Sequence, residues 1–443
     1  MPTAVCDIAP NSSDDTIVVI GSEPRVLPVI LLCIGFPIYL ILLLSSLIAV
    51  IFVADVSTTV IQTNMFGSLD NFPLLAIPFF ILAGEIMGQG GIARRVIVWV
   101  TALTGSARGS LPVTTIVSSE LFGAMSHTAV GTVAAVGRLV YPALKSGGYG
   151  DRFTVSLIAS SGAIAVVIPP SISMILYSMS AQQSAIALFT AGILPSLLIG
   201  LVDAVYVVLY SRSRKVAAGE RASWPKIWAA TKEAGWALGT PFVIFGGIYG
   251  GVFTPTEAAG VAAVYSLVVT MFIYRDIGWR DLWRITLAAV FLISQILIIV
   301  TAAGIYSWLL TTSGIPQNIV GAMNALQLPL WQVLLLVNLG LLLVGSFLEP
   351  PAAIMILTPL LLPVVQAAGV NAIHFGIIMA VNLSIGMYTP PFGLNLFASQ
   401  AIFNQPLGSI YRGVVPFVLI NFATLMLISY VPAISLVLVG AAP

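Results

Sequence analysis

Five long stretches of this chain contain no Asp, Glu, Lys or Arg, and they constrain its fold more than any other feature. They cover residues 26–54, 153–202, 285–348, 350–411 and 413–443. A membrane-spanning helix needs about 20 consecutive apolar residues, so each stretch holds one to three. Only 7% of the residues are charged, whereas soluble domains average about 25%. With the apolar segments near 72–144 and 227–274, the pattern predicts an all-α polytopic membrane protein with about 10–12 membrane elements.

The rest of the composition argues against several classes of function. The net charge is +1, and no basic patch is present that would bind nucleic acid. Cys6 and Cys33 fit neither a disulfide framework nor a metal site. The sequence has no Walker A, G-x-G-x-x-G, G-x-S-x-G or H-E-x-x-H motif, so no enzyme activity and no cofactor is expected. Residues 1–25 are polar and lack the basic start of a signal peptide, which predicts a tail or short surface segment.

Basic loops set the predicted orientation in the membrane. The segments 211–226 and 274–284 are rich in Arg and Lys, and the turn 145–152 contains Lys145 and Arg152. Basic loops face the cytoplasm in most membrane proteins, so all three are expected on that side.

An internal repeat relates two proline pairs, Pro169–Pro170 and Pro390–Pro391. The shift along the chain that places the first pair on the second is here called the repeat shift. Without a gap it also aligns three further pairs: Pro142 with Pro363, Gly148 with Gly369, and Ser161 with Asn382.

The two copies are expected to have opposite orientations. The turn at 366–373, which matches the basic turn 145–152, has no charge, so it is expected on the external side. Inverted repeats with interrupted helices are typical of secondary transporters. The alternative is a chance likeness between two apolar segments.

This repeat divides the chain into a polar tail (1–25), a first half (26–210), a cytoplasmic loop with connecting helices (211–284) and a second half (285–443). Each half is expected to contain one re-entrant hairpin followed by one broken helix. The predicted hairpins are 121–144 and 345–365, and the predicted broken helices are 153–177 and 373–398.

The breaks at the proline pairs are candidate ion sites. Two adjacent prolines interrupt the helical hydrogen bonds, and in hydrocarbon the freed carbonyl groups need a partner. Small and polar side chains surround both breaks: Ser160, Ser161 and Ser171 in the first, and Asn382, Gly386, Thr389, Gly393 and Asn395 in the second. Neutral oxygens beside bare carbonyls suit a partly dehydrated Na⁺. The alternative is a pair of simple kinks whose hydroxyls bond back to their own helices.

The hairpin tips supply further candidates. Ser126, His127 and Thr128 lie at the first tip, and Glu349 lies at the second. A charge at membrane depth is costly and usually functional, which favours a binding role for Glu349 over a helix-capping role at the surface. A hydrogen-bonded structural imidazole is favoured over a proton relay for His127. Glu257, which follows Thr254 and Pro255, predicts a capped helix start.

Several strings resemble the large membrane subunit of the tripartite ATP-independent periplasmic (TRAP) transporters. They include FPLLAIPFFILAGEIM, GGIARR, IPPSISMILY, GGVFTPTEAAGVAAVYSL, NLSIGMYTPPFGLNLF and YVPAISL, spread over residues 26–440. The resemblance implies a Na⁺-driven importer of small organic acids, such as dicarboxylates or sugar acids, in the bacterial inner membrane. It also implies two partners, a periplasmic substrate-binding protein and a small four-helix membrane subunit. The implied mechanism is an elevator, in which hairpins and broken helices slide against a scaffold.

The resemblance also carries site residues. The first hairpin tip of the family falls on Ser126 to Thr132, but His127–Thr128 and Gly131–Thr132 replace the usual Gly-Ser and Ala-Asp, which bears on the substrate class and on one ion ligand. The acidic position of the second hairpin falls on Glu349, followed here by Pro350 and Pro351 instead of the usual Pro-Thr. The polar positions of the breaks fall on Ser160, Ser161, Asn382, Thr389 and Asn395.

The sequence thus predicts a Na⁺-coupled permease with Na⁺ near Ser126, Ser161, Asn382 and Thr389, surrounded by membrane lipid. A stand-alone Na⁺/anion symporter without a binding protein is the main alternative. A channel and an intramembrane enzyme are less favoured.

Overall fold

The computed structural model describes residues 31, 35–52, 57, 59–105, 107–214 and 223–440. These residues form helices and connecting turns, with no strand among them. The predicted tail at 1–25 and the middle of the loop 211–226 lie outside the described residues. The all-α class predicted from the sequence is confirmed for the part that is described.

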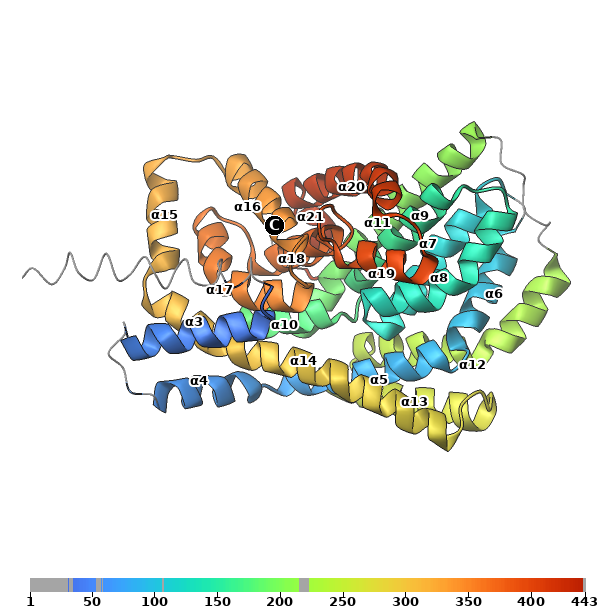
Figure 1. The fold of residues 1–443 in the computed structure, drawn as a ribbon, viewed down its shortest axis with the longest axis horizontal. Helices are drawn as coiled ribbons and strands as arrows, with labels where there is room; N and C mark the ends of the chain where they lie inside the picture. The colour runs from blue at the N-terminus through green and yellow to red at the C-terminus, as the bar shows by residue number, and fades with distance from the viewer. Residues whose placement is uncertain are drawn as a thin grey trace, which may run out of the picture.

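One side of the molecule is a layer of long helices, here called the scaffold layer. It consists of α3 (Ile38–Phe52), α4 (Thr59–Leu69), α5 (Ala76–Gln89), α13 (Pro255–Val268) and α14 (Trp279–Thr312), which run along the lower edge of Figure 1. Helix α14 packs against α3, α4 and α5. Its 34 residues correspond to about 50 Å, longer than the hydrocarbon core of a bilayer.

Local sequence explains where α13 begins. The Thr254 hydroxyl accepts a hydrogen bond from the Glu257 backbone N–H at 3.3 Å, and the Glu257 carboxylate accepts one from the Thr254 N–H at 2.8 Å. This reciprocal capping box, with Pro255 at the first helical position, satisfies backbone donors that the helix leaves free. The capped start predicted at Glu257 is confirmed.

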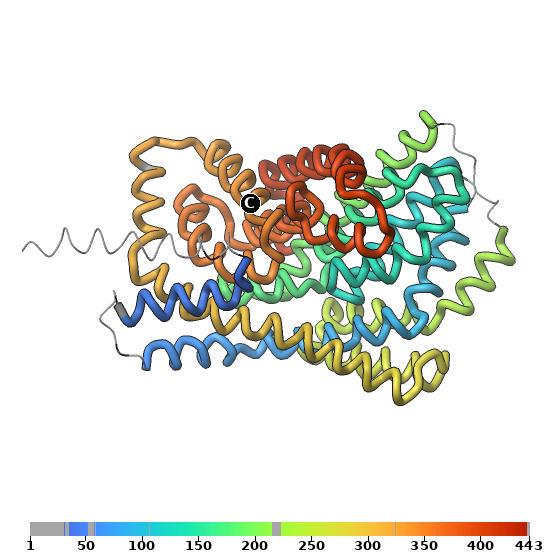
Figure 2. Tube along the Cα trace, in the orientation of Figure 1, coloured from blue at the N-terminus to red at the C-terminus, as the bar shows by residue number. Residues whose placement is uncertain are grey.

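The other side, here called the core layer, contains two sets of five helices. The first set is α7 (Ser110–Ser126), α8 (Ala129–Ser146), α9 (Asp151–Ile164), α10 (Ile172–Ser180) and α11 (Ala185–Ser213). The second set is α16 (Leu330–Gly345), α17 (Pro350–Ala367), α18 (Ala372–Gly386), α19 (Leu394–Phe403) and α20 (Leu407–Tyr430). Figure 2 shows the two sets side by side, green to cyan against orange to red.

The bounds of these helices follow the repeat shift found in the sequence. That shift places both ends of α8 on the two ends of α17, and it places the first residue of α9 on the first residue of α18. The turns between them also match, because Gly148 and Gly369 both have φ of +89°. Helices α6 (Ile92–Thr104) and α15 (Ile315–Ala325), which precede the two sets, begin at nearly the same shift.

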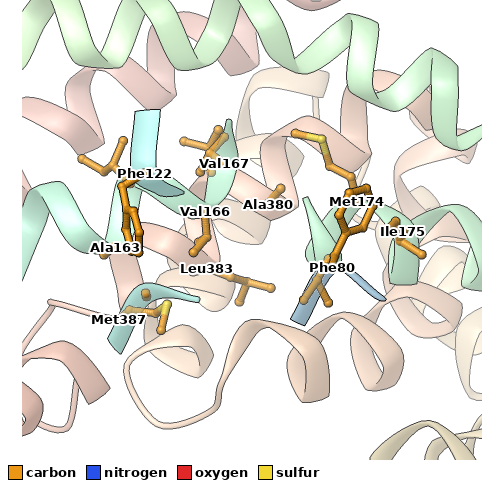
Figure 3. Close-up of a cluster of buried hydrophobic side chains, with 14 of the residues drawn as sticks. Phe80, Phe122, Ala163, Val166, Val167, Met174, Ile175, Ala380, Leu383 and Met387 are labelled. Atoms are coloured by element: carbon orange, nitrogen blue, oxygen red, sulfur yellow. The ribbon is translucent and has the colours of Figure 1, made fainter. Parts of the chain in front are cut away.

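Two interrupted helices, α9–α10 and α18–α19, occupy the centre of the core layer. Helix α9 continues through the short 3₁₀ segment Ala165–Val167 and meets α10 at a bend of 44°. Every residue of α18 from His374 to Gly386 is buried. Side chains from α5, α7, the first break and α18 pack together there, among them Phe80, Phe122, Val166 and Leu383 (Figure 3). The apolar core therefore joins both halves of the chain.

Six described helices are long and apolar enough to cross a membrane, or seven if the bent pair α9–α10 is one span. Four shorter apolar helices are Ile38–Ile51, Leu330–Gly345, Ala372–Gly386 and Leu394–Phe403. The sequence-based number of 10–12 elements included such half-length segments, because hydropathy does not separate a broken helix from a full span.

The helices around the predicted hairpins and broken helices have their own bounds. Helix α7, which leads to the first predicted tip, begins at Ser110, ahead of the predicted hairpin limit 121, since Pro112 falls in its first turn, where proline is tolerated. Helix α16, which leads to the second predicted tip, begins at Leu330 and ends at Gly345, where the second predicted hairpin starts. The broken helices span Asp151–Ser180 and Ala372–Phe403, so the predicted limits 153–177 and 373–398 fall inside them.

Candidate functional site

A small cavity lies where the two predicted hairpin tips, the two breaks and α14 meet. Its volume is about 160 Å³, below the range of ordinary small-molecule pockets, about 300–1,000 Å³. The polar or proline residues that line it are His127, Thr128, Ser173, Gln295, Glu349, Pro350 and Pro351. The structure thus brings Thr128 and Glu349, which come from the two predicted tips, to one cavity. Ser126 does not line this cavity.

Four helices of the core layer begin at this cavity. Ala129 of α8, Ile172 of α10, Pro350 of α17 and Leu394 of α19 are the first residues of their helices, and all four line it. Of the residues that precede these starts, Thr128, Ser171 and Glu349 form no side-chain capping bond with any described residue, and Gly393 has no side chain that could form one. Helix N-termini carry partial positive charge and free N–H groups, so the cavity is suited to an anion. Proline at 350 and 351 removes two of those donors.

At the first predicted tip, His127 joins the turn between α7 and α8 to the first break. It ends α7 with φ of +55°, and its Nδ1 lies 2.9 Å from the backbone carbonyl oxygen of Pro170. A carbonyl only accepts, so the proton belongs on Nδ1. The ring also packs edge-on against Phe80 at 4.4 Å between centroids. This geometry supports the structural role favoured for His127.

Ser126 and Thr128 are linked through Thr132. The Ser126 and Thr132 hydroxyl oxygens are 3.1 Å apart, and the Thr132 hydroxyl donates to the Thr128 carbonyl oxygen at 2.8 Å. Thr132 stands at one of the positions where the tip departs from the family pattern. There its hydroxyl closes the first turn of α8.

A second, larger groove reaches the first tip from the other side. Its volume is about 580 Å³, and its lining includes Glu85, Arg94, Ser126, Thr128 and Arg138. Thr128 lines both spaces, so it stands between the groove and the tip cavity.

At the first break, three serines differ in their bonding. The Ser160 hydroxyl donates to the Leu157 carbonyl of its own helix at 3.1 Å. The Ser171 hydroxyl crosses the break and donates to the Val166 carbonyl at 2.7 Å. The Ser161 hydroxyl is buried and forms no hydrogen bond with any described residue. A buried polar group without a partner is uncommon and marks a candidate ligand position.

At the second break, Asn382 is the counterpart of Ser161. Its amide nitrogen donates to the backbone carbonyl of Asn338 at 2.9 Å and to the Asn338 side-chain oxygen at 2.8 Å. Its own side-chain oxygen is buried and has no partner among the described residues. Both repeat-related positions therefore present a free buried oxygen.

The other polar candidates of the second break also donate hydrogen bonds. The Thr389 hydroxyl donates to the Ile385 carbonyl of its own helix at 2.8 Å, and the Asn395 amide nitrogen donates to the Ala159 carbonyl of the first half at 3.0 Å. The Asn395 side-chain oxygen is buried and has no partner among the described residues. At Gly386 and Gly393 another part of the backbone comes very close. A Cβ at Gly386 would lie 2.6 Å from the Gly345 Cα, and a Cβ at Gly393 would lie 2.6 Å from the Met387 carbonyl oxygen. In each proline pair, the peptide bond between the two prolines is cis.

Sequence reasoning missed Asn338 and Gln295. Asn338 lies on α16 and meets Asn382 only through tertiary packing, and Gln295 reaches the tip cavity from α14. A signal existed for both, because each is an amide within the largely apolar, charge-free stretch 285–348.

Comparison with known proteins agrees with this geometry. Residues 26–434 match the family model described as the tripartite ATP-independent periplasmic transporter, DctM component. A C4-dicarboxylate TRAP transporter large permease protein of Pseudomonas aeruginosa is 39% identical, with 89% of this chain and 92% of that protein covered. An ectoine TRAP transporter large permease protein of Halomonas elongata is 35% identical, with 92% and 96% covered.

Among solved structures, the Alcanivorax borkumensis YdaH transporter superposes with a TM-score of 0.59 at 16% identity, covering 93% of this chain and 98% of that one. That likeness concerns the fold alone. The family inferred from the motifs is confirmed by the family model and the permease relatives. The chain therefore belongs to the DctM component family of the tripartite ATP-independent periplasmic transporters, which are permeases of the bacterial inner membrane.

Proposed function

We propose that this chain is the permease subunit of a Na⁺-coupled secondary transporter that imports a small organic acid. The observation that carries the proposal is the pair of free buried oxygens at repeat-related positions, the Ser161 hydroxyl and the Asn382 side-chain oxygen. In each case the neighbouring proline pair leaves backbone carbonyls without helical donors. Neutral oxygen ligands in a partly dehydrated site suit Na⁺, and no nucleotide motif offers another energy source.

The cargo site of this proposal is the cavity between the two tips. Four helix N-termini converge there, which favours an anion although no Lys or Arg is among its described lining residues. Relatives are named for transport of C4-dicarboxylate, isethionate, ectoine and 2,3-diketo-L-gulonate. For this chain we infer a dicarboxylate or sugar acid, with Glu349 and Gln295 contacting its hydroxyl or protonated groups.

The layered arrangement supports an elevator mechanism with inverted repeats. The helix bounds that match at the repeat shift suggest that α7–α11 and α16–α20 are two copies of one unit. The core layer would move as one body against the scaffold layer, because hydrogen bonds tie its two halves together. Such motion would carry the tip cavity between the two sides of the membrane.

Two partners follow from the family. We infer that a periplasmic binding protein delivers the cargo and that a small membrane subunit covers part of the scaffold layer. Helix α14 supports the second inference, since large apolar side chains such as Trp283, Leu287 and Phe291 are exposed on it. One relative from Oleidesulfovibrio alaskensis, a permease protein named DctMQ, is matched over only 65% of its length.

Uptake into proteoliposomes tests the proposal. The chain is reconstituted with the small membrane subunit, the binding protein is added outside, and a panel of labelled C4-dicarboxylates and sugar acids is offered. We expect uptake of at least one compound that needs an inward Na⁺ gradient and no ATP. Uptake at full rate with K⁺ in place of Na⁺, and without a proton gradient, would contradict Na⁺ coupling.

The same assay separates the main alternative. A stand-alone Na⁺/anion symporter would transport equally fast without the binding protein. A permease of a tripartite system loses most uptake when that protein is left out.

A further inference from the structure

Two carboxylic acids lie inside the core layer and do not line the tip cavity. Glu120 on α7 is the only charged residue between Arg108 and Arg138, and Asp203 on α11 is the only one between Arg152 and Arg212. Asp203 is 1% exposed. The Asn421 amide nitrogen, on α20, lies 3.1 and 3.3 Å from its two carboxylate oxygens.

The Glu120 side chain can approach Asp203 because Gly200 has no side chain and leaves room for the Glu120 carboxyl group. Gly200 lies one helical turn before Asp203 on α11, and a Cβ built there would be 2.7 Å from the Glu120 carboxyl carbon. The two acids interact electrostatically. The Glu120 Oε1 atom is buried and has no hydrogen-bond partner among the described residues.

The surroundings of the two acids provide polar contacts. The Tyr388 hydroxyl lies beside the Asn421 side chain, is fully buried, and makes no hydrogen bond of ordinary geometry with a described residue. Tyr206 and Tyr388 are the other titratable groups that interact with Asp203. No Lys, Arg or His in the described ranges forms an ion pair with either acid.

Two unpaired carboxylates cannot both remain charged at such a place. Burying an isolated charge is unfavourable because the charge loses its hydration, and a second like charge nearby adds repulsion. A bound proton removes one charge and turns one carboxyl oxygen into a donor. The free oxygens of Glu120, Asn421 and Tyr388 can accept that hydrogen bond.

We propose that Glu120 and Asp203 form an intramembrane proton-binding site in which the two carboxyl groups hold at least one proton at neutral pH. The partly exposed Glu120 is the point of entry, and the sealed Asp203 is the inner acceptor. Tyr388 joins the site to the second break, because it directly precedes Thr389 and the proline pair. The proposal does not depend on the cargo or on Na⁺ coupling.

Infrared spectroscopy of the purified chain in lipid tests it. A neutral carboxylic acid gives a carbonyl-stretch band that ionised carboxylates lack, and the band shifts when the proton is replaced by deuterium. We expect this band in the wild-type protein at neutral pH, with a shift in D₂O. Relative to the wild type, the intensity of this band should fall in Glu120→Gln and in Asp203→Asn, because each variant removes one carboxyl group. Each amide retains the shape of the neutral acid, so the packing is preserved.

The control is Asp281→Asn, which removes an exposed carboxylate paired with Arg284 at 2.8 Å and should leave the band unchanged. If one variant fails to assemble, the change in band intensity in the other variant still decides the matter. Absence of the band in the wild-type protein, or equal intensity in both folded variants and the wild type, would overturn the proposal. A band that is lost on adding Na⁺ alone would mean that the site holds a metal cation, and would overturn it too.

Discussion

The Ser384 hydroxyl donates a hydrogen bond to the backbone carbonyl oxygen of Ala163 at 2.5 Å, and these two residues are separated by 221 positions, which is the repeat shift. The contact therefore joins equivalent places in the two broken helices, just before each break. A second bond, from the Asn395 amide to the Ala159 carbonyl, joins the same pair of segments. Because both bonds are buried, they fix the two breaks relative to each other.

The close approach of α16 and α18 depends on glycine. We expect Gly386→Ala to destabilise the protein by about 1–3 kcal/mol or more, because its Cβ would meet the Gly345 backbone, which cannot move aside as a side chain can. Thermal unfolding monitored by size-exclusion chromatography would measure the change. The matched control is Gly340→Ala on α16, where a Cβ would meet nothing within 4 Å. Equal melting temperatures for the two variants would contradict the packing described.

Asn338 and Asn382 should act as a coupled pair. Removing Asn338 leaves the Asn382 amide buried without its partner, at a cost of about 1–3 kcal/mol. In a double-mutant cycle with Asn338→Ala and Asn382→Ala, we expect a coupling free energy of about 0.5–3 kcal/mol. The control cycle pairs Asn338→Ala with Ser196→Ala, whose hydroxyl bonds only within α11. If the effects of the two substitutions on the free energy of unfolding were additive in the first cycle, the two side chains would not be coupled.

The order of the central segments was predictable from sequence because proline and lone polar residues are conspicuous in apolar stretches. Pro169 and Pro390 gave the breaks and the repeat shift that the helix bounds later matched. The length of α7 and α16 was not predictable, since apolar composition alone does not mark where a hairpin arm begins. The hydrogen-bond partners of Asn382 and His127 could not be predicted from the sequence either. The partner of Asn382 is 44 residues away in the chain, and the partner of His127 is 43 residues away.

The proposed inversion of the two halves predicts opposite labelling of two equivalent helix ends. Ser146 ends α8 and Ala367 ends α17, and both are exposed. In a variant with Cys6 and Cys33 replaced by Ser, an impermeant maleimide should label Ser146→Cys from the cytoplasmic side and Ala367→Cys from the periplasmic side. Arg280→Cys, in the basic loop 274–284, is the orientation control and should label with Ser146→Cys. Labelling of positions 146 and 367 from one side would refute the inverted repeat.

Gln295 is expected to contact the cargo. It lines the tip cavity from α14, and loss of one neutral hydrogen bond costs about 0.5–1.5 kcal/mol, so Gln295→Ala should raise KM about 2- to 10-fold. The proteoliposome uptake assay measures this value. Ser294→Ala is the neighbouring control, because its exposed hydroxyl bonds back to Val290 of the same helix. An unchanged KM in Gln295→Ala would place the cargo elsewhere.

The central claim is that Na⁺ binds at the breaks, and Ser161 offers the sharpest test of it. Its hydroxyl has no partner among the described residues, so Ser161→Ala removes no existing hydrogen bond and should leave the fold intact. If the hydroxyl is a Na⁺ ligand, its loss should weaken Na⁺ binding by a few kcal/mol, which is about tenfold or more in affinity.

The decisive measurement is the binding of radioactive sodium to the purified wild-type protein, Ser161→Ala and the control Ser196→Ala. We predict saturable binding that unlabelled Na⁺ displaces and K⁺ does not, with affinity at least tenfold weaker in Ser161→Ala and unchanged in Ser196→Ala. Saturable binding of equal affinity in Ser161→Ala, or no saturable binding in the wild-type protein, would contradict the assignment of the breaks as Na⁺ sites.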